Sequence, residues 1–505
     1  MSNNTTISDA AGHGEVRQHP EVTIRTGRVR GRWRQTIGEG TYGQSAAFLG
    51  IPFAQAPVGD RRFMAPVPAE PWDDVRDAAE FAATAQRGDP GVTLIPEPSV
   101  PGQSTLNVNV FTPSPHSPTD QGLPVLVWIH GGGYFAGSPA SPWYDGRNFN
   151  RDGVVTVTVS YRLGFDGFGW IDGAPSNRGV RDWLLALEWV RDNIAAFGGD
   201  PGRVTIAGQS AGGGAVLTLL GMEAAQHLFH GVYAISGALG DVSSERAERL
   251  ARTIAAEGGV QPTLAGFSSL SEERLLALQK KATEMKGDEF MTVVNEGLPL
   301  GPMVDGDLIR RPTYESLRQG IGADKPVVLG ATDDEFTMVF AGQEAKLALV
   351  PQQLLLKKLG VTKQTRKAYV AANADIVALG KARLAGRVVT DRMFRRAVVQ
   401  VAAARGSAPT WTYRFSWTSG AFGFAEHCLD VPFFFDCLDG PAIEPLAGPH
   451  PPQELADEVH TAATSFIATG DPGWPQHGGE PGVSRVFDVP SRTEPDAFAA
   501  VRALL

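Results

Sequence analysis

The sequence contains little cysteine and no long apolar run. Only two of its 505 residues are cysteines, Cys428 and Cys437, which are too few for a disulfide framework. It has no stretch of about 18 apolar residues, so we expect no membrane span and no membrane partner. The first 20 residues lack the apolar segment of a secretory signal peptide. We therefore predict a cytoplasmic protein in which residues 1–20 form a flexible tail.

Positive charge is also scarce. Lys and Arg number 45 against 55 Asp and Glu, which gives a net charge of −10. Because nucleic-acid binding needs concentrated positive charge, this balance disfavours DNA or RNA as a partner. Hydrophobic residues make up 42% of the chain and charged residues 20%, as in ordinary globular proteins. The length is compatible with one large α/β unit.

Apolar strand segments alternate with helical segments along much of the chain. Buried strands are expected within 123–135, 153–164, 203–209, 231–236, 325–332 and 409–417, and helices within 179–201 and 210–221. This alternation predicts an α/β fold with a large, mostly parallel sheet and helices on both faces. We expect one domain over residues 21–505, with charged helical insertions at about 241–300 and 341–405 that act as a lid.

The tetrapeptide Gly-Gln-Ser-Ala occurs twice, around Ser45 and around Ser210. Ser210 follows a predicted strand and opens a predicted helix, and Gly208 and Gly212 flank it at two residues on either side. A serine on so sharp a turn needs small neighbours, and the helix N-terminus beside it stabilises negative charge. Ser45 has Ala47 in place of the second glycine and lies in a predicted hairpin. We therefore predict that Ser210 is the reactive serine.

A reactive serine also requires a general base and an acid that orients the base. In α/β-hydrolases these residues follow the serine in the order acid, then histidine. Asp333, Asp334 and Glu335 follow the predicted strand at 325–332, and spacing alone does not choose among them.

Four histidines follow these acids. His427 lies in a loop between a strand and an aromatic run and is the best placed. His450 and His477 fall in loops rich in Pro and Gly, and we expect His460 to be solvated on a helix. We therefore favour His427 as the base.

The segment His130–Tyr134 supplies three glycines directly after a buried strand. Their backbone N–H groups are open enough to approach a tetrahedral oxyanion. Gly131, Gly133 and Ala136 also match a loose dinucleotide-binding fingerprint. That fingerprint requires a helix immediately after the loop and an acid at the end of the next strand. The chain instead continues with residues that break helices and offers Ser160, so we disfavour a nucleotide site.

Together these segments resemble the type-B carboxylesterase family, which includes bacterial para-nitrobenzyl esterases and cholinesterases. The resemblance extends from about residue 22 to 476. The matching segments are FLGIPFAQAPVGDRRFMAP, NVFTP, HGGGY, SYRLG, NIAAFGGDPGRVTIAGQSAGG, GPMVDGDLI and GDPGWP, in family order. The resemblance implies the α/β-hydrolase fold and ester hydrolysis through an acyl-enzyme, without a metal or an organic cofactor.

The resemblance also assigns site residues. The family pattern Gly-x-Thr-x-x-Glu matches residues 330–335 and implies Glu335 as the acid. The similarity of EHCLDVPF to the family's histidine motif implies His427 as the base, with Asp430 in the place of a family Glu. The implied oxyanion donors are the N–H groups of Gly132, Gly133 and Ala211.

The resemblance further implies a buried Arg162–Asp182 pair, and this chain also departs from the family elsewhere. The family's cysteine loop is absent, because residues 103–106 read Gln-Ser-Thr-Leu. The family's Glu partner for Arg62 is absent. Gln209 stands where animal members carry Glu. Phe336 replaces the glycine that usually follows the acid, which implies a narrower pocket wall there.

We therefore predict a serine carboxylesterase for esters of apolar or aromatic alcohols, acting as a monomer or a homodimer. Candidate substrate contacts are Tyr134, Phe135, Phe336 and Phe424. A choline ester is disfavoured, because no Trp lies between Trp72 and Trp128, where cholinesterases place the ring that meets the ammonium group. The same catalytic residues would also serve a carbamate, an aryl amide or a lactone. The alternative of another class is a non-catalytic, cholinesterase-like binding protein.

Overall fold

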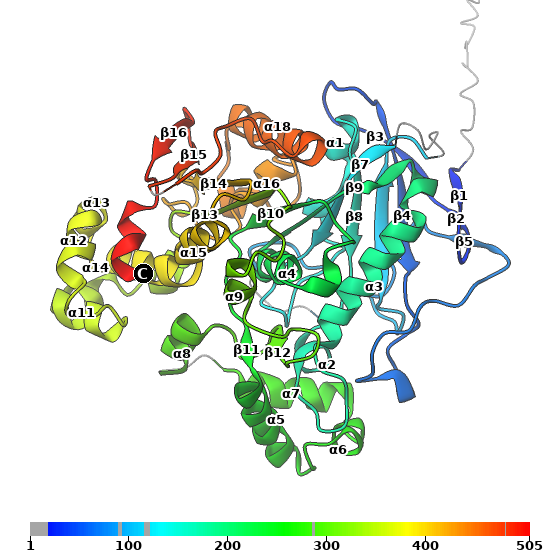
Figure 1. Cartoon of the computed structure of the whole chain (residues 1–505), viewed down its shortest axis with the longest axis horizontal. Coiled ribbons are helices and arrows are strands. Elements are labelled where there is room, and N and C mark those ends of the chain that lie inside the picture. The colour runs from blue at the N-terminus through cyan, green and yellow to red at the C-terminus, as the bar shows by residue number, and fades with distance from the viewer. Residues whose placement is uncertain (1–18, 89–92, 116–121, 285–287, 480) are drawn as a thin grey trace, which may run out of the picture.

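An eleven-stranded sheet forms the centre of the computed structural model, which describes residues 19–88, 93–115, 122–284, 288–479 and 481–505 (Figure 1). Residues 1–18 of the predicted tail lie outside the described residues. In spatial order the strands are β16 (Arg492–Pro495), β15 (Val483–Phe487), β14 (Thr410–Phe415), β13 (Val327–Thr332), β10 (Gly231–Ile235), β9 (Gly199–Gln209), β7 (Leu123–Ile129), β8 (Val155–Val159), β6 (Asn107–Thr112), β4 (Gln44–Pro52) and β3 (Arg32–Gln35).

The strands from β15 to β8 are parallel to their neighbours, and antiparallel strands complete both edges. The predicted mostly parallel sheet is therefore confirmed. Two small sheets lie outside it, one of β1 (Glu21–Ile24), β2 (Gly27–Arg30) and β5 (Val75–Asp77), and one of β11 (Val242–Ser243) and β12 (Met303–Val304).

Strand β7 shows why both faces of the sheet are covered. Val125, Val127 and Ile129 pack into the core on one face, whereas Leu126 and Trp128 pack into the core on the other. Side chains alternate along a strand, so a continuous apolar run needs a hydrophobic layer on each side.

Helices supply these two layers. The first face is covered by α2 (Gly164–Phe168), α3 (Arg178–Asn193), α4 (Ala211–Leu220), α9 (Thr313–Arg318) and α15 (Arg396–Arg405). The second face is covered by α1 (Arg147–Arg151), α16 (Val431–Phe434), α17 (Glu444–Ala447) and α18 (Gln453–Thr469). Within the described residues, no helix combines the length and apolar character needed to cross a membrane.

The two predicted insertions are helical, and their action as a lid remains a prediction. The first contains α5 (Ser244–Gly258), α6 (Leu264–Ser268), α7 (Glu272–Ala282) and α8 (Asp288–Glu296). The second contains α10 (Glu344–Ala348), α11 (Gln352–Lys358), α12 (Arg366–Ala372), α13 (Ala374–Ala378) and α14 (Lys381–Thr390), and the π-helical turn η7 (Asp391–Arg395) joins α14 to α15. Short 3-10 turns are η1 (Gly59–Arg61), η3 (Pro142–Tyr144), η4 (Ile194–Phe197), η5 (Glu223–Ala225), η6 (Thr337–Phe340) and η8 (Ala499–Leu504).

A buried ion pair joins the end of β8 to α3, as the resemblance implied. The Arg162 Nε and Nη2 atoms lie 2.9 and 2.6 Å from the two carboxylate oxygens of Asp182. Arg162 is 4% exposed and Asp182 is fully buried. Arg62, which lacks its family partner, donates instead to Asp166, with an Nε–Oδ2 distance of 3.0 Å.

We expect Asp182→Asn to destabilise the fold by about 3–5 kcal/mol, because the Arg162 charge then stays buried without its partner. The exposed Arg252–Glu248 pair on α5 provides the control. Glu248→Gln should cost about 0.5 kcal/mol or less. Thermal unfolding of the two variants checks the comparison. Equal transition temperatures would contradict a structural role for the buried pair.

Candidate active site

Ser210 occupies a sharp turn between β9 and α4. Its φ angle is +58°, which is unusual for a residue other than glycine. A Cβ atom on Gly208 would lie 2.6 Å from the carbonyl oxygen of Ile129, and one on Gly212 would lie 2.0 Å from it. Only glycine fits at these two positions, in agreement with the predicted turn. The turn exposes the Ser210 hydroxyl at the carboxyl edge of the sheet.

A chain of hydrogen bonds starts at this hydroxyl. Ser210 Oγ lies 2.9 Å from His427 Nε2. On the other side of the ring, His427 Nδ1 lies 2.5 Å from Glu335 Oε2. The Nδ1–H group donates to the carboxylate, which leaves Nε2 to accept the proton of the serine hydroxyl.

Glu335 is fully buried and its second carboxylate oxygen is also occupied. Oε1 accepts hydrogen bonds from the Ser236 hydroxyl at 2.6 Å and from the backbone N–H of Thr332 at 2.8 Å. The backbone N–H of His427 donates to the Glu335 carbonyl at 3.1 Å. These contacts fix the orientation of the carboxylate against the imidazole.

The two neighbouring acids face arginines instead. Asp333 forms a two-pronged pair with Arg414, with both N–O distances at 2.9 Å. Burial raises the pKa of Asp333, but the charge and hydrogen bonds of Arg414, together with the charges of Arg395 and Arg387, outweigh burial and hold the pKa well below its usual range. Asp334 lies 3.3 Å from Arg387 of α14. Of the three candidate acids, only Glu335 contacts the histidine.

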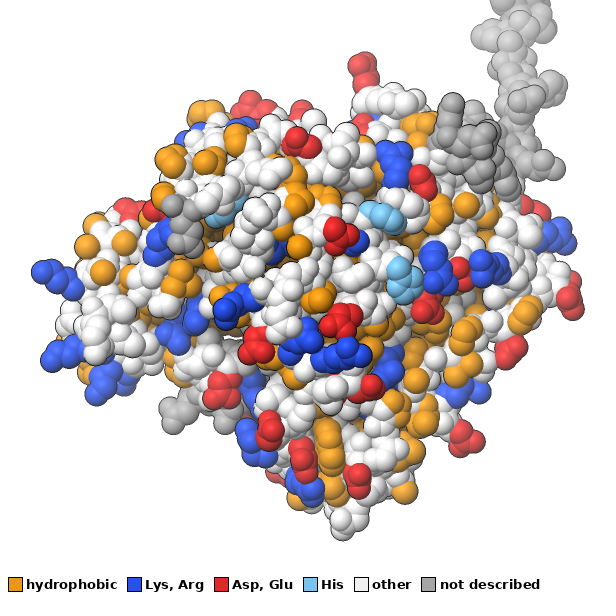
Figure 2. Space-filling view, viewed as in Figure 1, with side chains coloured by type: hydrophobic (Ala, Val, Ile, Leu, Met, Phe, Trp, Pro, Cys, Tyr) orange, Lys and Arg blue, Asp and Glu red, His pale blue; other side chains and the backbone are white. Residues whose placement is uncertain are grey.

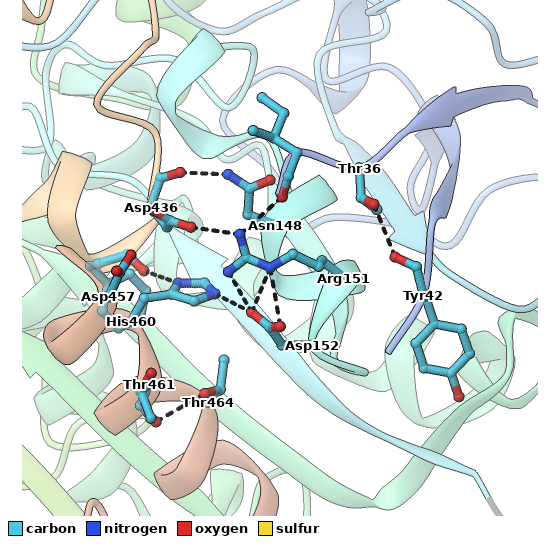
Figure 3. Close-up of polar contacts among 12 residues, drawn as sticks. Thr36, Tyr42, Asn148, Arg151, Asp152, Asp436, Asp457, His460, Thr461 and Thr464 are labelled. Carbon is cyan, nitrogen blue, oxygen red and sulfur yellow. Dashed lines mark hydrogen bonds and ion pairs between the residues drawn. The ribbon is translucent and has the colours of Figure 1, made fainter. Parts of the chain in front are cut away.

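The other candidate histidines lie away from the serine. His450 is exposed and His477 contacts the Thr412 hydroxyl at 2.9 Å. The expectation that His460 is solvated is wrong, because its side chain is 2% exposed. Its ring nitrogens lie 2.7 Å from the Phe434 carbonyl and 3.0 Å from Asp152 Oδ2 (Figure 3). Helix α18 packs this ring against the second face of the sheet, which its apolar stripe alone did not indicate.

The glycine loop after β7 supplies backbone N–H groups near Ser210. Gly132 and Gly133 have φ angles of +105° and +61°, and Ala211 is the first residue of α4. In the described part of the chain, none of these three N–H groups has a hydrogen-bond acceptor. The next element after the loop is η3 rather than the helix that a dinucleotide site requires.

Aromatic rings enclose His427. Phe336 stacks on the imidazole with a centroid distance of 5.0 Å and an interplanar angle of 24°, and Phe394 lies at 5.0 Å. Burial lowers the pKa of His427, whereas Cys428 and the Glu335 carboxylate favour the protonated ring. The net direction is upward, so the pKa of His427 lies above its ordinary value.

Gln209 also contacts the histidine, which the sequence did not show beyond marking a departure from the family. Its Nε2 atom lies 3.2 Å from His427 Nε2, and the residue is 1% exposed. An amide N–H at this place favours the neutral imidazole, which has a lone pair there. The loop that carries His427 also contains two buried acids, Glu426 and Asp430. Burial raises the pKa of Glu426 to about 8 and that of Asp430 to about 7.

The four aromatic candidates for substrate contact differ in exposure. Tyr134 is 6% exposed and packs against Phe168 and Trp183, with centroid distances of 5.1 and 6.1 Å. It therefore belongs to the core. Phe135 is 49% exposed. Phe424 is half-buried, and an arginine guanidinium from α14 lies 4.9 Å from its ring.

Ser45 of the other Gly-Gln-Ser-Ala segment is fully buried. Its hydroxyl donates to Asn150 Oδ1 at 2.6 Å and accepts from Arg34 at 3.3 Å. These contacts indicate that Ser45 has a structural role in the packing of the sheet. Among the described residues, no three His, Cys, Asp or Glu side chains are grouped to hold a metal ion.

Comparison with known proteins places the chain in a family. The sequence profile of the carboxylesterase family matches residues 18–484. The chain belongs to the carboxylesterase family. It is 32% identical to the para-nitrobenzyl esterase of Bacillus subtilis (strain 168), over 96% of this chain and 98% of that protein. It is also 32% identical to the phenmedipham hydrolase of Pseudarthrobacter oxydans, over 84% of this chain and 86% of that protein.

A solved structure gives the same result. The carboxylesterase of Geobacillus stearothermophilus superimposes with a TM-score of 0.81 at 32% identity, over 96% of this chain and 99% of that chain. The predicted α/β-hydrolase fold is thereby confirmed, and this carboxylesterase is a carboxylic ester hydrolase.

We expect Gln209→Glu to shift the pH dependence of this carboxylesterase. The ring acts as a base only when neutral, so kcat/KM of the native enzyme should fall as the pH drops through the pKa of His427, above about pH 6.5. A carboxylate beside Nε2 favours the charged ring and should move this fall upward by roughly one to three pH units. The readout is the pH profile of kcat/KM.

Gln209→Met is the matched control, because it removes the amide without adding charge. Its profile should stay within about half a pH unit of the native one. A Gln209→Glu profile that coincides with the native curve would refute an electrostatic link between the two side chains.

Proposed function

We propose that this carboxylesterase acts as a serine hydrolase with Ser210 as nucleophile, His427 as general base and Glu335 as the orienting acid. The observation that carries the proposal is the unbroken hydrogen-bonded chain from Ser210 Oγ through both ring nitrogens to Glu335. A serine beside a histidine that a buried acid orients is the arrangement that activates a hydroxyl. A non-catalytic binding protein would not need this arrangement.

The reaction proceeds in two halves. His427 Nε2 takes the hydroxyl proton as Ser210 Oγ bonds to the ester carbonyl carbon, and the carbonyl oxygen becomes an oxyanion. The N–H groups of Gly132, Gly133 and Ala211 stabilise that charge. When the tetrahedral species collapses, the alcohol leaves with the proton from His427. Water then repeats the sequence on the acyl-enzyme and releases the acid and the free serine.

The substrate in this proposal is a neutral ester of an apolar or aromatic alcohol. In this proposal exposed Phe135, Phe336 against the histidine and half-buried Phe424 supply the apolar contacts to the substrate. Tyr134 supports the glycine loop from the core and is therefore no longer counted among the proposed substrate contacts. A carbamate shares the tetrahedral intermediate, so carbamates are tested beside the esters. The cytoplasmic location and the monomeric or homodimeric state remain predictions from sequence.

The first test is covalent labelling. A fluorophosphonate probe should modify the peptide that contains Ser210 and leave the Ser45 peptide unmodified, as mass spectrometry would show. Ser210→Ala should lower kcat by about 10⁴-fold or more. Ser45→Ala should leave kcat within a few-fold of the native value. Label on the Ser45 peptide would overturn the assignment of the nucleophile.

The second test is substrate preference. Apolar contacts without a placed ammonium-binding ring predict higher kcat/KM for aryl acetates and butyrates than for the matching choline esters. The preference should depend little on salt. A panel of aryl, choline, carbamate and anilide substrates measures it. Faster choline-ester hydrolysis that collapses with added salt would show that charge, rather than apolar contact, selects the substrate.

A further inference from the structure

Lysine is distributed very unevenly along this chain. There are ten lysines in the sequence, and six of them lie between Lys346 and Lys381. Residues 344–383 carry eight basic and two acidic side chains, which gives this segment a net charge of +6. Because the whole chain carries −10, the remainder carries −16. The second insertion is therefore a basic lobe on an acidic protein.

Five of these lysines point into solvent. They are Lys346, Lys357, Lys358, Lys363 and Lys367, here called the lysine-rich face. Within the part of the chain that the structure describes, none of the five forms an ion pair with an acid. Blue side chains line the left edge of the molecule in Figure 2, over the lobe labelled α11 to α14 in Figure 1. The positive charges of this face are therefore available to bind a negatively charged partner.

Exposed leucines accompany the lysines. Leu349 is 85% exposed, Leu379 is 59% exposed and Leu354 is 43% exposed. Leu349 lies three residues after Lys346, and Leu354 lies three and four residues before the two lysines that end α11. Neighbours at these helical spacings lie on the same side of a helix.

A tether brings two of these leucines together. The Lys381 ammonium donates to the carbonyls of Ala348 and Val350, both at 2.6 Å. This contact holds the segment before α14, which contains Leu379, against the turn that contains Leu349. Leu349 and Leu379 therefore lie on neighbouring segments of the lobe.

The exposed leucines are not needed for the core of the lobe. Leu355, Leu356 and Leu359 are buried with residues of α12 and α14 in a separate hydrophobic cluster. A lobe with a complete core that still exposes large apolar side chains among unpaired lysines has the character of a contact surface. Lysine and leucine together suit a negatively charged surface with an apolar layer beneath it.

We propose that the lysine-rich face and its exposed leucines bind the surface of an anionic lipid bilayer. The lysines contact phosphate headgroups, and Leu349, Leu354 and Leu379 enter the interface. The absence of a spanning segment in the sequence predicts no membrane partner, but a contact with the bilayer surface needs no span. The lobe follows η6 directly, and Phe336 before η6 packs on His427. Binding would thus hold the active site close to lipid-dissolved esters.

The test is co-sedimentation of the full chain with lipid vesicles. The protein should pellet with vesicles of phosphatidylcholine mixed with phosphatidylglycerol, but not with phosphatidylcholine alone, and binding should weaken as salt rises. Lys357→Glu with Lys358→Glu should weaken it by roughly tenfold or more. Leu349→Ser should weaken the binding that persists at high salt.

The matched control is Lys280→Glu with Lys281→Glu on α7, which changes the net charge equally on another part of the surface. It should bind within about twofold of the native protein. Hydrolysis of a water-soluble ester without vesicles should be unchanged in all variants and so reports correct folding. Native protein that stays in the supernatant, equal losses in both double variants, or retention by heparin without vesicle binding would each overturn the proposal.

Discussion

The close approach of the Ile129 carbonyl to the turn around Ser210 is the constraint on which the site depends. That oxygen leaves no space for a Cβ atom at Gly208 or Gly212, so β7, β9 and α4 meet at backbone distance. The backbone at Ser210 must then enter the left-handed region to pass from strand to helix. Because β7 runs on directly into the glycine loop, one contact positions both the hydroxyl and the N–H groups proposed to face the oxyanion.

The parallel sheet delivers the remaining groups to the same edge. Ser236 follows β10 and Glu335 follows β13, while His427 lies on the loop after β14. Neighbouring strands that run in the same direction bring their carboxyl ends together, so residues far apart in sequence become hydrogen-bonding partners. Asp333 and Asp334, the two residues before Glu335, hold the loop after β13 through ion pairs with Arg414 and Arg387.

Much of this site could be predicted from local patterns, because the serine turn and the glycine loop impose requirements that neighbouring residues must meet. The choice of Glu335 over Asp334 could not be predicted from local patterns, because it depends on where Arg387 of a distant helix lies. Only the family resemblance indicated Glu335. The error at His460 has a similar cause. An apolar stripe predicts which side of a helix faces the core, but not that a polar ring is buried beside Asp152. The contact of Gln209 with the base likewise exists only in the folded protein.

The uneven use of lysine has a practical meaning. Every lysine ammonium group lies between Lys280 and Lys381, while the strands that build the catalytic edge use arginine as their only cation. Amine-directed chemistry such as attachment to an aldehyde-bearing support would therefore reach the molecule mainly through its two helical insertions. A surface-coupled layer of this enzyme would therefore be held mainly by the insertions, because Lys325, the one lysine outside them, is mostly buried and paired with Asp324.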